Sequence, residues 1–125
     1  MKDQIVITAV GDIQLSRDIK KYINKCNNQD YSNIFKYVKN FIKESDISLG
    51  NLESPISDKI NLKKNIMKGS PNFLAENKAI EALNNSGLNT LTIANNHSND
   101  YSNIAIQDTI KILEKHNFNI LSLKS

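Results

Sequence analysis

The segment Ile5-Val6-Ile7-Thr8-Ala9-Val10-Gly11-Asp12 decides the fold of this chain, because an apolar, β-branched run ends there in a polar pair. The same pattern recurs twice: Ile47-Ser48-Leu49 leads into Asn51-Leu52-Glu53, and Leu91-Thr92-Ile93-Ala94 leads into Asn95-Asn96-His97. Each run predicts a buried strand of a parallel sheet. The carboxyl ends of parallel strands meet at one edge, where ligands bind, so we expect the three polar clusters to converge. An Asp, a Glu, an Asn and a His at one edge indicate a site for a hard metal ion.

Segments with helical periodicity separate these runs, and Gly87 stands where one of the helices would end. The predicted order is strand 4–10, helix 15–25, helix 32–44, strand 47–49, an irregular segment 54–71, helix 76–86, strand 88–94, helix 102–116 and strand 118–123. Alternating strands and helices predict an α/β fold with a parallel sheet and right-handed crossovers.

The chain of 125 residues corresponds to one domain, 1–125. The last predicted strand, 118–123, ends almost at the final residue, which leaves one face of the sheet without its next covering helix. We therefore expect a partial domain that is completed by a missing C-terminal half or by a second chain.

Composition excludes several classes of protein. The net charge of +3 and the few aromatic residues argue against a nucleic-acid partner. No apolar run is long enough for a membrane span, and no signal peptide is recognisable, so we expect a cytoplasmic protein, or an extracytoplasmic one if an export signal has been removed. A single cysteine, Cys26, excludes an internal disulfide and a thiolate metal cluster within the chain.

Each candidate site residue has a purely structural alternative. Asp12 is either a metal ligand or a cap for the following helix, and Glu53 is either a ligand or a solvated loop residue. Asn95-Asn96-His97 provides either ligands and a proton donor or simply a turn. Asp100 either accepts a hydrogen bond from the imidazole, which fixes its tautomer, or caps the last helix together with Ser102.

Three stretches together resemble the bacterial capsule-synthesis protein A family. They are AVGDIQLSR (9–17), DISLGNLESPIS (46–57) and LTIANNHSNDYSNIAIQDTIKILEKHNFNI (91–120). The family pattern is Gly-Asp with a following Arg, then Asn-Leu-Glu-x-Pro, then Ala-Asn-Asn-His-x-x-Asp, and all three parts occur here in order. The resemblance covers nearly the whole chain. It implies poly-γ-glutamate capsule formation and the N-terminal half of a calcineurin-like metallophosphoesterase fold, an αββα sandwich.

Carried over residue by residue, the resemblance implies that Asp12, Glu53 and Asn96 are metal ligands. His97 would touch the scissile or transferred group. Arg17, the only arginine, would bind a carboxylate or phosphate of the substrate, although its alternative is a surface helix residue. The implied cofactor is a divalent metal (Mn, Mg, Fe or Zn), with two ions in the complete protein.

The chain also departs from the family pattern. Gln14 stands where typical metallophosphoesterases have a histidine, and Ser102 and Ala105 replace glycines. The later histidine motifs of the family are absent, and His116 at a helix end is better explained as a surface residue. The sequence therefore predicts about half of a metal site.

The leading interpretation is a metal-dependent hydrolase or transferase that acts on an anionic cell-envelope polymer precursor or a phosphoester. The alternative is a non-catalytic binding or assembly module with the same fold, or an inactive fragment. A flavodoxin-like phosphate-binding domain is disfavoured, because the loop after the first strand carries Asp12 and one glycine instead of a glycine-rich run.

Overall fold

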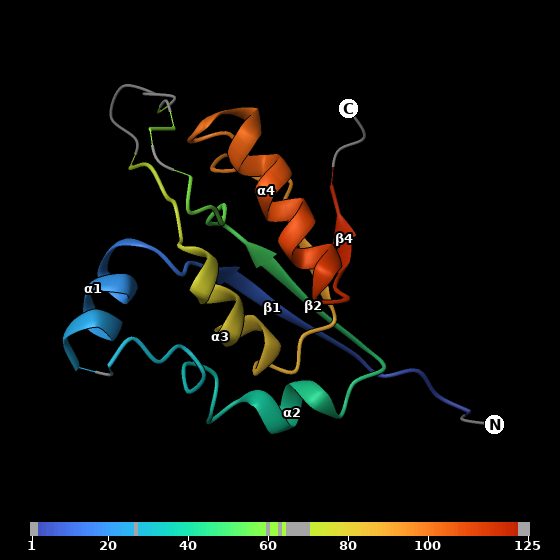
Figure 1. Cartoon of the computed structure of the whole chain (residues 1–125). Helices are drawn as coiled ribbons and strands as arrows, with labels where there is room; N and C mark the ends of the chain where they lie inside the picture. Colours follow the sequence, from blue (N-terminus) through green and yellow to red (C-terminus); the bar gives the residue numbers. More distant parts are fainter. Residues whose placement is uncertain (1–2, 27, 60, 63, 65–70, 123–125) are drawn as a thin grey trace.

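The structure, a computed structural model, describes residues 3–26, 28–59, 61–62, 64 and 71–122. Its elements are β1 (Ile7–Ile13), α1 (Arg17–Cys26), α2 (Lys39–Lys43), β2 (Ile47–Leu52), the short 3-10 helix η1 (Asn77–Ala79), α3 (Ile80–Asn84), β3 (Thr90–Thr92), α4 (Ser102–Lys115) and β4 (Asn119–Leu121). The strands form one parallel sheet in the order β1-β2-β3-β4 (Figure 1). The predicted α/β fold with a parallel sheet is confirmed.

One face of the sheet is packed against the helices. Ser48 and Leu52 on this face are almost completely buried. Gly50 between them is so tightly enclosed that a Cβ atom there would lie 2.6 Å from Ile13 Cδ1. Helices α3 and α4 lie across the strands in Figure 1, and Leu83 of α3 and Leu113 of α4 belong to the same buried cluster. The hydrophobic core therefore lies between this face and the helices.

The opposite face of the sheet is open. Ile7 and Ile47 are register partners at the beginning of β1 and β2, and their side chains are 64% and 42% exposed. Leu121 of β4 is 51% exposed. Parallel sheets are ordinarily covered on both faces. The residues that the structure describes cover only one, and we call the exposed side, marked by Ile7, Ile47 and Leu121, the open sheet face.

The strand boundaries differ from the predicted ones. Strand β1 continues to Ile13 with a register shift between Ala9 and Asp12, and β2 continues to Leu52. The predicted end of this strand at residue 10 was wrong, because the parallel pairing with β2 continues through Asp12. In contrast, β3 (Thr90–Thr92) and β4 (Asn119–Leu121) are shorter than 88–94 and 118–123, and residue 123 lies outside the described residues.

The helix predicted over 32–44 is reduced to Lys39–Lys43, with turns over 32–38. Asp30 accepts a hydrogen bond from the Ser32 backbone N–H at 2.8 Å, which fixes a turn where the helix was expected to begin. The helix predicted over 76–86 is η1 followed by α3, which ends at Asn84. Gly87 has a φ of +88° and lies against the Lys39 carbonyl, so no Cβ fits there.

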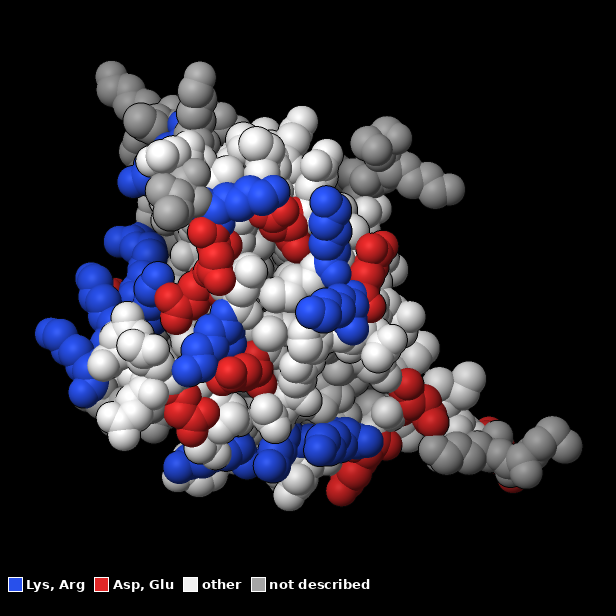
Figure 2. All heavy atoms as spheres, viewed as in Figure 1, with Lys and Arg blue, Asp and Glu red and all other residues white. Residues whose placement is uncertain are grey.

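The segment predicted to be irregular, 54–71, is anchored where the structure describes it. Ile56 forms an isolated parallel bridge with Ala75, and Ser57 donates a 2.7 Å hydrogen bond to Asp108 of α4. Lys59 pairs with the same carboxylate at 2.8 Å. Residues 65–70 lie outside the described residues. Figure 2 shows lysines and carboxylates intermixed over the face that α3 and α4 present.

Candidate functional site

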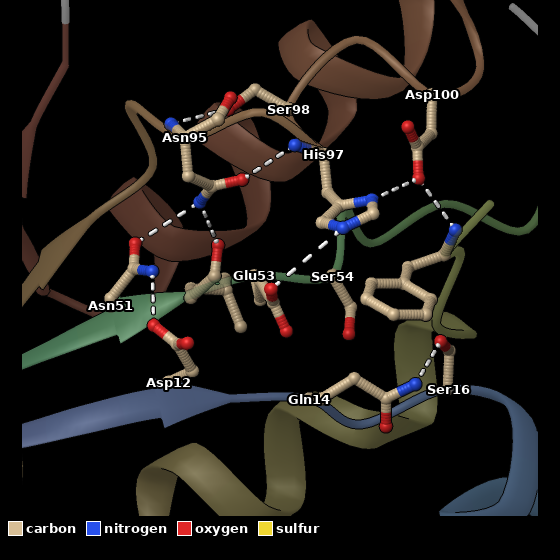
Figure 3. A network of polar contacts seen from close by, with 12 residues as sticks. Asp12, Gln14, Ser16, Asn51, Glu53, Ser54, Asn95, His97, Ser98 and Asp100 are labelled. Carbon is tan, nitrogen blue, oxygen red and sulfur yellow. Dashed lines mark hydrogen bonds and ion pairs between the residues drawn. The ribbon is translucent and has the colours of Figure 1, made fainter. Parts of the chain in front are cut away.

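The three polar clusters meet at the carboxyl edge of the sheet, where they form a chain of hydrogen bonds (Figure 3). Asp12 at the end of β1 accepts a 2.7 Å hydrogen bond from the Asn51 amide of β2. The Asn51 carbonyl oxygen accepts in turn from the Asn95 amide at 3.1 Å, and that amide also donates to the Leu52 carbonyl at 3.0 Å. Asp12 therefore links adjacent strands instead of capping α1.

Asn95 shapes the turn that carries the histidine. Its side-chain oxygen accepts the His97 backbone N–H at 3.0 Å, while its own N–H donates to the Ser98 hydroxyl at 3.0 Å. Ser98 closes the turn by donating to the carbonyls of Asn95 and Ile93. This is an Asx-type turn, in which an asparagine side chain replaces a backbone acceptor.

The imidazole of His97 is buried and held by Asp100. Its Nδ1 lies 2.8 Å from Asp100 Oδ2, and because a carboxylate can only accept, Nδ1 is the donor. His97 Nε2 consequently faces Glu53, whose Oε1 is 3.8 Å away. Of the two roles open to Asp100, the structure shows the contact with the imidazole, and α4 begins after Tyr101 without a side-chain cap.

Phe73 is the functional neighbour that sequence reasoning missed. Its backbone N–H donates to Asp100 Oδ2 at 2.7 Å, and its ring lies 4.1 Å from the His97 ring, centroid to centroid. The exposed Arg17 guanidinium lies 5.8 Å from the same phenyl centroid. Phe73 follows a stretch without helical or strand periodicity, so the sequence pattern carried no signal for it.

Asn96 lies apart from this network. Its side chain is exposed, whereas that of Asn95 is half-buried and makes the contacts that join the strands. Glu53 at the end of β2 is half-buried, and its backbone N–H donates to the Ile13 carbonyl at 3.0 Å. The structure thus brings Asp12, Glu53, His97 and Asp100 to one edge, and Asn96 is exposed on the turn that carries His97.

The donor set suits part of a site for a hard cation. Asp12 and Glu53 offer carboxylate oxygens, and Asn96 offers an amide oxygen that is open to solvent. Within the part of the chain that the structure describes, however, no three His, Cys, Asp or Glu side chains form a group that could hold a metal ion. The oxygen atoms of these residues suit a divalent cation, and further ligands are needed for a complete site.

Among the helices that the structure describes, none is long and apolar enough to span a bilayer.

Comparison with known proteins matches residues 6–121 to the family described as "Bacterial capsule synthesis protein PGA_cap". The "Capsule biosynthesis protein CapA" of Bacillus anthracis is 33% identical over 115 residues, which cover 90% of this chain and 27% of that protein. The "PGA biosynthesis protein CapA" of Bacillus subtilis (strain 168) is 31% identical over 120 residues, which cover 95% of this chain and 30% of that protein. This chain therefore spans less than a third of these relatives, and it belongs to the bacterial capsule synthesis protein PGA_cap family.

Proposed function

We propose that this chain provides part of the active site of a capsule-biosynthesis protein, a metal-dependent hydrolase or transferase that acts on an anionic cell-envelope polymer precursor. Two relatives in Bacillus are named for capsule biosynthesis and for PGA biosynthesis, which supports a poly-γ-glutamate-type polymer. The chain spans 27% and 30% of those proteins, so the remaining part of the site comes from residues outside this span or from a second chain.

The observation that carries the proposal is the orientation of His97. Asp100 fixes the proton on Nδ1, so the neutral imidazole presents a lone pair at Nε2, and the imidazolium presents an N–H there. The Glu53 carboxylate oxygen Oε1 lies 3.8 Å from that nitrogen. His97 can therefore take a proton from a nucleophile or give one to a leaving oxygen, with Asp100 holding the ring in place.

The proposed cofactor is a divalent metal ion, Mn, Mg, Fe or Zn. Asp12, Glu53 and Asn96 would contribute ligands, with the rest supplied by the completing part of the protein. When bound, such an ion polarises a substrate oxygen. Arg17 is exposed beside Phe73, and its planar guanidinium suits a carboxylate or phosphate of the polymer precursor.

A second candidate function is a non-catalytic binding or assembly module. It is favoured by the incomplete ligand set, because within the described ranges no cluster of three metal-binding side chains forms. Under this alternative the chain keeps the fold and contributes a surface, while the chemistry is done by another protein.

The test of the leading proposal is to compare turnover with metal content in the purified full-length protein, completed by its missing half or partner, that carries His97→Ala. We expect turnover to fall about a hundred-fold or more, since general acid–base help is lost, while metal content changes little. Asp100→Asn should show a smaller loss of turnover. His116→Ala is the matched control, because His116 is the other histidine of the chain and bonds to Asn84 instead of to the site.

Two outcomes would contradict the proposal. If His97→Ala loses its metal but regains full turnover when metal is added in excess, His97 is a ligand and not the proton-transfer group. If the unmodified full-length protein shows no metal-dependent activity on phosphoesters or on glutamate-polymer precursors, the binding-module alternative is favoured.

A further inference from the structure

A short segment, 71–75, lies beside the site, where Phe73 contacts His97 and Asp100. It is attached at its end by Ala75, which is fully buried, and whose N–H donates to the Pro55 carbonyl at 2.8 Å. The Ser57 N–H donates back to the Ala75 carbonyl at 3.0 Å, which forms the parallel bridge there. These contacts fix the backbone of the segment independently of the Phe73 side chain.

Phe73 contacts both His97 and Asp100, the two residues of the proposed proton-transfer pair. Its N–H and the His97 Nδ1–H both donate to Asp100 Oδ2, at 2.7 Å and 2.8 Å. Its ring packs on the His97 imidazole with an angle of 31° between the planes. One residue therefore holds the carboxylate through its backbone and the imidazole through its side chain.

Packing in the hydrophobic core does not explain the position of the Phe73 ring. Phe73 is only half-buried and is not a member of the central hydrophobic cluster, which contains the neighbouring Ala75. The Phe73 ring packs instead on the buried His97 imidazole. Packing on one side of a ring restricts its rotation and keeps water from the Nδ1–H···Oδ2 bond.

We infer that Phe73 is a positioning residue: it fixes the orientation of the His97 imidazole and places Arg17, which lies 5.8 Å from the phenyl centroid, beside it. The inference rests on the proposed role of His97 in proton transfer. Phe73 itself exchanges no proton and binds no metal. It determines whether Nε2 points consistently toward the reacting atoms and whether the guanidinium binds an anionic group at a fixed distance from that nitrogen.

The first test reads the position of the imidazole without any assay of activity. In the NMR spectrum of the purified protein, the stacked phenyl ring should displace the His97 ring-proton resonances upfield. Phe73→Leu, which keeps the backbone N–H, should remove that displacement, and Phe73→Tyr should retain it. Phe41→Leu is the matched control, because Phe41 is 74% exposed and is not part of the site.

The second test is kinetic and uses the same variants. We expect Phe73→Leu to lower kcat by about ten-fold through misorientation of the imidazole, with a smaller change in KM, and Phe73→Tyr to restore it. Combined with Asp100→Asn, Phe73→Leu should cost less than the product of the two separate losses, because both changes release the same ring.

The outcomes separate this inference from the proposed function. If Phe73→Leu lowers the melting temperature but leaves the His97 resonances and kcat unchanged, Phe73 is a structural residue and the inference is wrong. If the His97 resonances move as expected but no activity is found in the unmodified protein, the positioning contact stands and the proposed function fails.

Discussion

The side chain of Asn95 joins the turn after β3 to the end of β2 and to the backbone of His97. Its amide donates to Asn51 and to the Leu52 carbonyl, and its carbonyl oxygen accepts the His97 N–H. We predict that Asn95→Ala lowers the free energy of unfolding by about 1–3 kcal/mol, since it leaves partly buried polar groups without partners. Urea unfolding measures this change.

The adjacent asparagine is a matched control for that prediction. Asn96 has the same chemistry but is exposed, so Asn96→Ala should change the free energy of unfolding by less than about 0.5 kcal/mol. Equal effects of the two substitutions would show that the hydrogen bonds of Asn95 contribute nothing to stability.

At the scale of residues, the sequence predicted where the site lies but not which of its polar side chains makes which contact. The polar pairs after each apolar run correctly indicated that Asp12, Glu53 and His97 would lie at one edge. Two consecutive asparagines, however, are indistinguishable by composition. Only the hydrogen bonds of the folded turn show that Asn95 joins the strands, whereas Asn96 stays exposed.

Among the elements, α1 and η1 are connected through a buried tyrosine. Tyr31, which is fully buried, donates a 3.1 Å hydrogen bond to Glu76, and Lys20 of α1 pairs with the same carboxylate at 2.8 Å. Burial and the Glu76 charge raise the pKa of Tyr31 above its usual value of 10.0. Burial alone would raise the pKa of Glu76 as well, but the hydrogen bonds from Lys20 and Tyr31 hold it below the usual range.

This arrangement predicts a loss of stability in alkali. A raised pKa in the folded state means that Tyr31 stabilises the fold fully below about pH 10, and that this contribution is lost as the pH rises toward the folded-state pKa. Tyr31→Phe should cost about 1 kcal/mol at pH 8 through the lost hydrogen bond and should reduce the further loss above pH 10. Urea unfolding at pH 8, 10 and 11 measures both effects.

Tyr37→Phe is the control, because Tyr37 is 81% exposed. If Tyr31→Phe loses stability above pH 10 as steeply as the unmodified protein and Tyr37→Phe do, ionisation of Tyr31 is not the cause of the alkaline sensitivity.

The elements show where periodicity succeeds and where it fails. The spacing of apolar residues predicted a helix over 102–116, and α4 spans Ser102–Lys115, because a long amphipathic helix follows that spacing closely. The same spacing predicted a helix over 32–44, but the structure has only the five residues of α2 there. There, the Asp30 side chain competes for the backbone N–H groups, and local hydrogen bonds outweighed the pattern.

At the scale of the whole molecule, the open sheet face is the dominant feature. Ile7, Ile47 and Leu121 lie on it, at 64%, 42% and 51% exposure. The relatives are much longer than the matched span, which covers 27% and 30% of them. We expect residues that the relatives carry beyond this span, on the same polypeptide or a second one, to pack on this face.

We therefore predict that the chain by itself associates with rising concentration and binds a hydrophobic dye such as ANS. Ile7→Lys combined with Ile47→Lys should reduce both effects with little loss of folding stability, because these side chains are already largely exposed. Sedimentation velocity over a range of concentrations measures association.

Ile104→Lys is the control, since Ile104 is 46% exposed but lies on α4, which covers the other face of the sheet. Association that is unaffected by the double substitution, or reduced equally by Ile104→Lys, would show that the open sheet face does not drive it.

The order of the strands has a consequence for how the protein is made. Each strand pairs with the one that precedes it in the chain, so the sheet grows at one edge only. A ribosome that releases the chain from its N-terminus would deliver β1, β2, β3 and β4 in the order in which they assemble, and no early strand must wait for a late one. The nascent chain can thus assemble the edge that carries Asp12, Glu53 and His97 without waiting for a strand that follows β4.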